Sequence, residues 1–135
     1  MSDTSSVFSW PLRVYWEDTD AGGVVYHASY LRFMERARSE WLRARGIDQS
    51  TLKQTTGLAF LVREMQIDFL KAALLDDELL ATVNVQERRA ASILFTQTIT
   101  RVDGTELIRA RVRVACVDVE RMRPVQIPAD LIPGL

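Results

Sequence analysis

The sequence predicts an α+β domain, in which one long helix covers one face of an antiparallel sheet of about five strands. Two observations predict this arrangement. Apolar residues recur at helical spacing over one long segment, residues 28–45, and most of the chain after residue 60 alternates between apolar and polar residues. Such alternation is typical of antiparallel strands that bury one face. The chain has 135 residues, a length at which a single domain with its own core is expected.

The first expected elements are a short strand, a turn and the long helix. β-Branched and aromatic residues indicate a strand from Arg13 to Trp16, with Leu12 as an alternative start. Residues 17–23 are rich in Asp, Thr and Gly and have the composition of a turn. The segment that follows, residues 28–45, has the periodicity of an amphipathic helix.

Within this helix the apolar stripe predicts the face that packs on the sheet. Its members are Leu31, Phe33, Met34, Ala37, Trp41 and Leu42. Two charge pairs at a spacing of three, Glu35–Arg38 and Glu40–Arg43, are expected on the exposed side. Gly46 supplies a C-terminal stop for the helix.

Four strands are expected after the helix, and their ranges are 60–69, 80–87, 93–101 and 106 to about 120. In the first of these the apolar set is Leu61, Met65, Ile67 and Phe69. Asp103-Gly104, between the last two strands, is a strong signal for a tight turn. The sheet is therefore expected to be built mainly from consecutive antiparallel strands.

The last expected strand is unusually long, because strands in globular proteins typically have about 5–6 residues. One face carries an apolar row, Ile108, Ala110, Val112, Val114 and Cys116, and the other carries Arg109, Arg111 and Arg113. A long strand with an apolar face favours pairing or packing with a second copy of the chain. We therefore expect a homo-oligomer.

Composition excludes several classes of function. The formal net charge is −1, so no overall field attracts nucleic acid or an anionic membrane. Cys116 is the only cysteine, which rules out an internal disulfide and a zinc site built on several thiolates; it is expected to be a buried, inert residue. Residues 1–10 lack the basic start and apolar run of a signal peptide, and no transmembrane segment is expected. The sequence thus predicts a cytoplasmic protein.

The segment before the helix combines acids, two glycines and the only histidine of the chain. Its plainest interpretation is a solvated acidic turn. A calcium loop is disfavoured because Gly22 and Ser29 occupy positions that should supply ligands. A transition-metal site made by Asp18, Asp20 and His27 is a weak ligand set with one histidine. No metal and no other cofactor is therefore expected.

A second interpretation of the same segment is acid–base or nucleophilic chemistry at a helix N-terminus. Glycines let the backbone approach a ligand closely, and the start of a helix presents unpaired N–H groups with a partial positive charge. Such N–H groups can stabilise the oxyanion that develops when a carbonyl is attacked. A carboxylate beside them can act as nucleophile or activate water. The residues alone leave this interpretation and the acidic turn open.

The stretch "YWEDTDAGGVVYHASYLRFMERAR" strongly resembles the hotdog-fold acyl-CoA thioesterases of the 4-hydroxybenzoyl-CoA thioesterase group, and within it the Tol-Pal-associated branch. The resemblance is most specific over residues 14–42 and continues more loosely to "IPADLI" near the C-terminus. It implies a sheet wrapped around the helix, subunits that join their sheets into dimers or tetramers, and hydrolysis of acyl-CoA to free acid and CoA.

The resemblance also implies roles for individual residues. Asp20 corresponds to the catalytic carboxylate, and the backbone N–H of His27 to the oxyanion donor, with the imidazole of His27 as an alternative proton carrier. Gly23 lets the substrate approach, and Val25 and Tyr26 are expected to line the acyl pocket. The Tyr-His pair is typical of the Tol-Pal-associated branch and favours an acyl group other than hydroxybenzoyl.

The expectations for the CoA end and for Asp18 are less specific. Arg88 and Arg89 follow an expected strand and are candidates for contacts with the CoA phosphates, since arginine suits bidentate phosphate binding; solvated turn residues are the alternative. Asp18 is expected to be a supporting acid or a turn former. An alternative function is a module that docks on acyl carrier protein, with weak hydrolysis. A hotdog dehydratase is disfavoured because its longer His-acid motif is absent.

Overall fold

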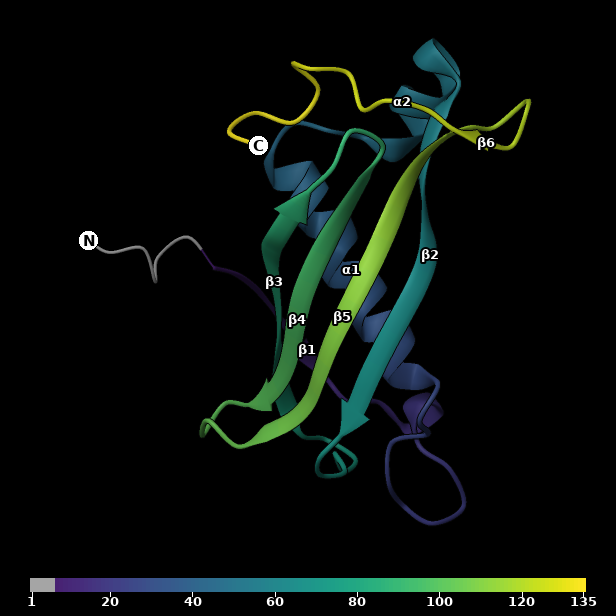
Figure 1. Ribbon diagram of the computed structural model, residues 1–135. Coiled ribbons are helices and arrows are strands. Elements are labelled where there is room, and N and C mark those ends of the chain that lie inside the picture. Colours follow the sequence, from purple (N-terminus) through teal and green to yellow (C-terminus); the bar gives the residue numbers. More distant parts are fainter. Residues whose placement is uncertain (1–6) are drawn as a thin grey trace.

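The computed structural model describes residues 7–135, and its elements form a curved sheet around a helix (Figure 1). In chain order they are β1 (Phe8–Arg13), a 3₁₀-helix η2 (Trp16–Asp18), α1 (Ser29–Ala44), α2 (Gln49–Thr56), β2 (Leu58–Phe69), β3 (Glu78–Arg88), β4 (Ser92–Arg101), β5 (Glu106–Asp118) and β6 (Arg123–Pro124). The strand order is β1-β3-β4-β5-β2, and β6 pairs with β5. All of the pairs are antiparallel.

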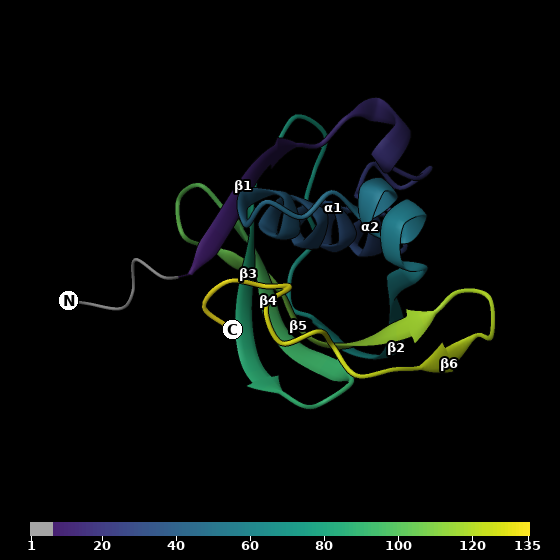
Figure 2. The same cartoon turned by 90° about the horizontal axis from the view of Figure 1, so that it is seen from above.

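Seen from above, the sheet curls around α1, so that the helix lies in the concave side (Figure 2). The predicted stripe forms the centre of the core, where Phe33, Met34 and Ala37 are fully buried. The ring of Trp41 packs edge-on against that of Phe95, with 5.1 Å between the ring centroids. Leu31 is the exception in the stripe, because 39% of its surface stays exposed at the side of α1 that faces β2.

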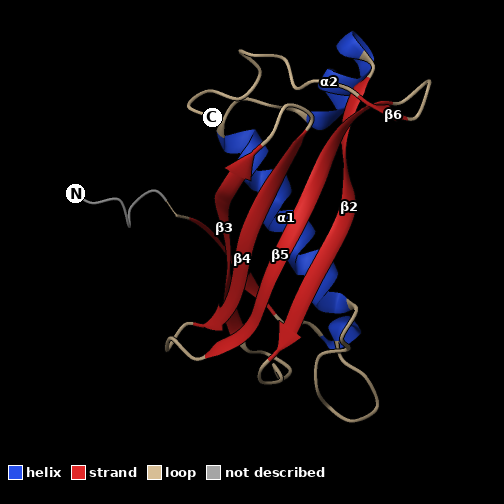
Figure 3. Cartoon of the chain, viewed as in Figure 1, coloured by secondary structure: helices blue, strands red, loops and turns tan. Residues whose placement is uncertain are grey.

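The structure has a second α-helix that the sequence did not predict (Figure 3). The long helix lies within one residue of its expected start and end, but a second helix, α2, follows it. Asp48 caps α2 by accepting hydrogen bonds from the N–H groups of Ser50 and Thr51, and Gly57 ends it in the left-handed conformation. Only Leu52 of α2 is buried, so the helix has no apolar stripe that periodicity could detect.

The predicted first strand is wrong in position. Strand β1 lies at Phe8–Arg13, and Phe8, Trp10 and Leu12 pack against the core. Pro11 lies inside β1, which is possible because β1 is an edge strand and needs a full set of hydrogen bonds on one side only. The aromatic residues that suggested the later position, Tyr15 and Trp16, are 62% and 78% exposed in and before η2.

The four later strands are where the sequence predicted them, although β2 starts at Leu58. A β-bulge between Val62 and Glu64 reverses the alternation, so that Phe60 packs against the core before it and Met65 and Ile67 after it. The predicted apolar set was therefore wrong for Leu61, which is 41% exposed. Phe69, at the end of β2, is also more than half exposed.

The long final strand is confirmed, since β5 has 13 residues. Its predicted apolar row is buried, including Cys116, whose burial raises the pKa of the thiol. One predicted charge pair also forms, with Arg43 Nε 3.3 Å from Glu40 Oε1. Among residues 7–135, no helix is long and apolar enough to cross a membrane.

Candidate active site at the start of helix α1

The loop before α1 projects beyond the end of the sheet, at the lower right of Figure 1. Asp20 is exposed at its tip, and its Oδ1 accepts a hydrogen bond of 2.8 Å from the N–H of Gly22. The Asp20 N–H donates to the Val24 carbonyl at 2.9 Å, and its carbonyl accepts from Gly23 N–H at 3.0 Å. The second carboxylate oxygen, Oδ2, has no partner in the described chain and is open to a ligand.

The two glycines have separate local reasons. A Cβ on Gly22 would lie 3.2 Å from Asp20 Oδ1, so a side chain there would press on the carboxylate. Gly23 has φ of +81°, a left-handed conformation that side chains rarely adopt. The glycine pair therefore shapes the turn that presents the Asp20 carboxylate.

Asp18 differs from Asp20 because it is buried, with 3% exposure. Its Oδ2 accepts a hydrogen bond of 2.8 Å from the N–H of Tyr15, and its Oδ1 lies 3.7 Å from Arg32 Nη2. The carbonyl of Asp18 accepts from Tyr26 N–H at 2.9 Å and from Ser29 Oγ at 3.2 Å. Asp18 thus ties the loop to the first residue of α1, the supporting role that was one of its two expected ones.

His27 is the last residue but one before α1, and its backbone N–H finds no acceptor within residues 7–135. Ala28, at the N-cap, has no side-chain oxygen that could cap the helix. The imidazole is exposed and lies beside two aromatic rings. The distance between ring centroids is 4.5 Å to Tyr26 and 6.5 Å to Phe69. The start of α1 therefore offers a free N–H donor beside an aromatic surface.

Backbone pairing brings both ends of the loop together. Thr19 and Val25 form an isolated antiparallel bridge. On its two sides the N–H of Asp20 donates to Val24 and the N–H of Tyr26 donates to Asp18. Tyr26 is 46% exposed, as expected for a residue that contacts a ligand, whereas Val25 is buried in the core at 4% exposure. The side chain of Val25 thus anchors the loop to the hydrophobic core.

The connection between β2 and β3 holds the loop from the other side, a feature that the sequence did not reveal. Val25 N–H donates to the Ala73 carbonyl at 2.9 Å, and Ala73 N–H donates to the Tyr30 hydroxyl at 2.9 Å. Arg101 binds the same connection, with Nε 3.1 Å from Asp77 Oδ2 and Nη2 2.8 Å from the Ala72 carbonyl. Burial raises the pKa of Tyr30, so its hydroxyl stays neutral.

Arg88 and Arg89 lie far from this loop. Arg88 ends β3 and Arg89 follows it in the hairpin with β4, at the top of Figure 1 and opposite the Asp20 loop. With 11 residues and about 3.3 Å per residue, β3 alone spans more than about 30 Å. Arg88 donates to the Leu135 carbonyl at 3.1 Å, and Arg89 pairs with Glu87 at 3.0 Å. Within one chain, the structure does not bring these arginines to Asp20 and His27.

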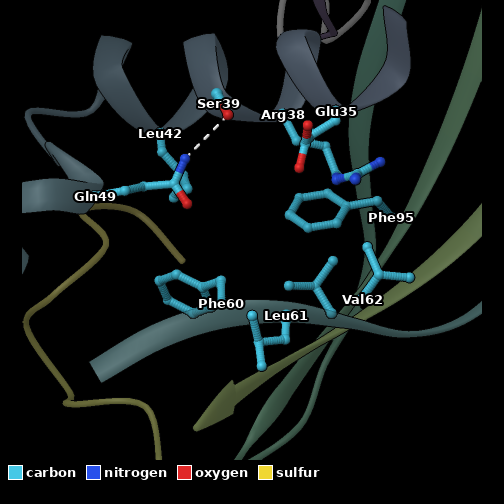
Figure 4. A pocket seen from close by; sticks show the side chains of 10 residues that line it. Glu35, Arg38, Ser39, Leu42, Gln49, Phe60, Leu61, Val62 and Phe95 are labelled. Atoms are coloured by element: carbon cyan, nitrogen blue, oxygen red, sulfur yellow. Dashed lines mark hydrogen bonds between the residues drawn. The ribbon is translucent and has the colours of Figure 1, made fainter. Parts of the chain in front are cut away.

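Two adjoining hollows lie between α1 and β2 and form a groove; Figure 4 shows the hollow that is lined by Leu42, Phe60 and Phe95. The first, of about 290 Å³, is lined near the start of α1 by Leu31, Arg32 and Met65. The second, of about 240 Å³, is lined by Leu42, Phe60, Phe95 and Val114, among others. Glu35, Arg38 and Val62 line both hollows and so mark their junction.

The predicted charge pair Glu35–Arg38 is wrong. Arg38 is 8% exposed and donates from Nη1 to Gln97 Oε1 at 2.9 Å, and no carboxylate of the described chain lies within ion-pair distance of it. It shares the buried face with Met34 and Trp41, which are four residues before and three residues after it. The described residues also contain no group of three or more His, Cys, Asp or Glu side chains suited to a metal, and metal independence stays a prediction.

Comparison with known proteins places this geometry in a family. The model of the thioesterase-like superfamily matches residues 14–135. The acyl-CoA thioesterase YbgC of Haemophilus influenzae is 51% identical over 124 residues, 92% of this chain and 90% of that protein. The acyl-CoA thioester hydrolase YbgC of Escherichia coli is 44% identical over 128 residues, 95% of each chain.

Solved structures agree with the sequence match. The crystal structure of a probable thioesterase from Bartonella henselae has a TM-score of 0.84 at 35% identity, over 90% of this chain and 99% of that one. A 4-hydroxybenzoyl-CoA thioesterase variant, solved with 4-hydroxybenzoyl-CoA, has a TM-score of 0.86 over 93% and 95% of the chains; at 21% identity it speaks for the fold alone. The curled antiparallel sheet with its helix is the hotdog fold, and the chain belongs to the thioesterase-like superfamily.

Proposed function

We propose that the protein is a thioesterase that hydrolyses an acyl-CoA to the free acid and CoA. The observation that carries the proposal is one loop that presents two groups: an open carboxylate oxygen on Asp20, and on His27 an N–H donor without an acceptor among the described residues. The relatives named acyl-CoA thioesterases, which match nearly the whole chain, support the same reaction.

Each group has a defined task in the proposed reaction. The N–H of His27 donates to the thioester carbonyl oxygen, where the positive end of α1 favours the negative charge of the transition state. Asp20 either attacks the carbonyl carbon, giving an anhydride that water then cleaves, or takes a proton from the attacking water. In both routes water supplies the hydroxyl of the acid and the proton of the CoA thiol, and Asp20 returns to its starting state.

The other predicted contacts belong to the same proposal. Tyr26 and Gly23 border the approach to the carboxylate, and Val25 sets the position of Tyr26 from below. Arg88 and Arg89 lie at the far end of the sheet, so a CoA bound at Asp20 of one chain meets the arginines of another copy. The site proposed here is therefore shared between subunits.

A homo-oligomer follows from the edges of the sheet. Strand β2 is an edge strand in the single chain, and Leu61, Val62, Phe69 and Leu70 on and beside it are exposed. An exposed edge with apolar residues favours pairing with a second copy. We propose a dimer through β2, with the tetramer expected from the family resemblance as a pair of such dimers. Light scattering of the purified protein checks this, and a fully active monomer would contradict it.

The decisive experiment replaces Asp20 with Asn, which removes the charge and keeps the shape. We expect kcat with an acyl-CoA substrate to fall at least about 100-fold, the typical contribution of a general base or nucleophile. Glu17→Gln is the matched control, because it removes one exposed acid from the same segment and should leave kcat unchanged. Hydrolysis by Asp20→Asn at near-normal rates, with folding intact, would show that the carboxylate is not the working group.

Docking on acyl carrier protein is the alternative, and the same proteins test it. A docking module would bind acyl carrier protein equally well before and after Asp20→Asn, with weak hydrolysis in both. The cytoplasmic location, predicted from the lack of signal-peptide and transmembrane patterns, and the Tol-Pal association, predicted from the resemblance, stay predictions. Fractionation of cells and co-purification with Tol-Pal proteins test them.

A further inference from the structure

The groove between α1 and β2 adjoins the proposed site. Leu31, in its first hollow, lies one turn of α1 beyond His27, and Met65 lies on β2 shortly before Phe69, whose ring meets that of His27. An acyl group whose carbonyl binds at the start of α1 can therefore extend along this groove. This step rests on the proposed thioesterase function.

Arg38 stands at the junction of the two hollows and is unusual for a buried residue. Its one hydrogen bond within the described chain goes to a neutral acceptor, Gln97 Oε1. Gln97 is itself fixed, since its Nε2 donates to the carbonyls of Met34 at 3.2 Å and Thr82 at 3.1 Å. Its carbonyl oxygen is thereby aimed at Arg38.

The guanidinium of Arg38 has five N–H donors, and one of them has an acceptor among the described residues. Burial lowers the pKa of this group, and the charge of Glu35, at the same junction, acts in the opposite direction. Stability alone explains the residue poorly, because replacing buried ionic groups with well-packed apolar ones is often neutral or stabilising. A role in selecting the acyl group that binds in the groove explains the residue better.

We propose that Arg38 is a specificity-determining residue that turns away long unsubstituted alkyl chains. The distal hollow is apolar, with Leu42, Phe60, Phe95 and Val114 around it, and could hold a long chain. A chain that reaches it must pass Arg38, whose unpaired N–H donors find no acceptor on a hydrocarbon. Acyl groups that end in the first hollow avoid this cost.

The test measures kcat/KM over a series of saturated straight-chain acyl-CoA substrates of increasing length. For the wild-type protein we expect kcat/KM to stop rising, and then to fall, once the chain is long enough to pass Arg38. A wild-type protein that prefers the longest chains would overturn the proposal without any variant. A wild-type protein that hydrolyses no acyl-CoA would instead contradict the thioesterase function itself.

The variants locate the effect. Arg38→Met combined with Gln97→Met gives an apolar junction and leaves no amide oxygen without its donor. We expect kcat/KM for the longest chains to rise about tenfold over wild type, while the shortest chain changes less than about threefold. Arg36→Met is the matched control, since it removes a cation from the exposed side of α1 and should keep the wild-type profile.

Arg38→Lys separates charge from shape, because it retains a buried cation and should still reject long chains. Circular dichroism melting and light scattering establish that each variant is folded and assembled as the wild type is. A folded Arg38→Met/Gln97→Met variant with the wild-type dependence on chain length would overturn the proposal, and so would an Arg38→Lys variant that accepts the longest chains.

Discussion

The two α-helices of residues 7–135 begin in opposite ways. Helix α2 is short and mostly exposed, and Asp48 caps it with hydrogen bonds of 2.9 Å and 3.4 Å from Ser50 and Thr51. Helix α1 is long and buried, yet Ala28 at its N-cap offers no side-chain acceptor. Helices in proteins gain most of their stability from packing, so α1 does not depend on a side-chain cap. The N–H of Ser29 donates to the Tyr26 carbonyl at 2.8 Å, and the N–H of His27, two residues before the helix, is left for a ligand.

Replacing His27 with Ala is expected to have the largest effect among the tests of this comparison. His27→Ala keeps the backbone N–H at the open helix start and removes the ring that lies against Tyr26 and Phe69. If the N–H is the working donor, kcat should fall less than about tenfold, or about 1.4 kcal/mol of barrier. Steady-state kinetics of the variant and the wild type measure it. A loss near 100-fold would assign the chemistry to the imidazole.

Removing the cap of α2 gives the converse result. Asp48→Ala should lower the free energy of unfolding by about 1 kcal/mol, the usual value for an N-cap. The turnover of acyl-CoA should stay at the wild-type level, because α2 lies away from the Asp20 loop. Urea denaturation and kinetics on one sample measure both quantities. Asp48→Asn, which keeps a good cap, is the control; a loss of turnover in Asp48→Ala alone would mean that the two helix starts are coupled.

Alkaline pH tests how the loop at the open end is held. Burial raises the pKa of Tyr30 above its ordinary value of about 10, so the folded state prefers the neutral hydroxyl. This contribution to stability is fully present below pH 10 and is lost as the pH rises through the raised pKa. Tyr30→Phe should flatten the alkaline side of the stability curve, as thermal melts from pH 8 to 11 would reveal. If the stability of Tyr30→Phe and of the wild type falls equally with rising pH, the buried hydroxyl of Tyr30 does not contribute to stability in this way.

The smallest expected effect is that of a chelator. Asp18, Asp20 and His27 lie in one loop, but Asp18 is already bonded to Tyr15 and near Arg32. Prolonged dialysis against EDTA should leave thioester hydrolysis unchanged. Activity that vanishes and returns upon addition of a divalent cation would mean that the open end of α1 works with a metal.

The periodicity of apolar residues predicted the elements that bury one continuous face. The stripe of α1, apart from Leu31, and the alternation of β5 are buried as expected, because each packs on one uninterrupted face. Helix α2 and β1 escaped prediction for opposite reasons: α2 buries only Leu52, and β1 contains Pro11, which is tolerated only because the strand lies at an edge. The bulge after Val62 changed the face of Leu61, and nothing in local alternation signals such an insertion.

The site shows the same division. Asp20, Gly23, Tyr26 and His27 are neighbours in sequence, and the structure places them in one loop. The contacts that hold the loop, from Tyr30 to Ala73 and from Arg101 to Asp77, join segments far apart in the chain, so spacing cannot reveal them. Arg38 did leave a signal: a cation four residues after Met34 interrupts the apolar stripe of α1, and that position predicts burial.

The sheet has two unlike edges. Strand β1 carries Pro11, which lacks an N–H to offer to another strand, whereas β2 carries no proline. Filaments need both edges, since each added chain must bind through one edge and present the other to the next. In the proposed dimer, pairing through β2 uses the same edge on both partners and leaves the two β1 edges outward, where Pro11 has no N–H to donate. Growth by strand addition would then end at a closed pair, and this would protect the protein from open-ended aggregation.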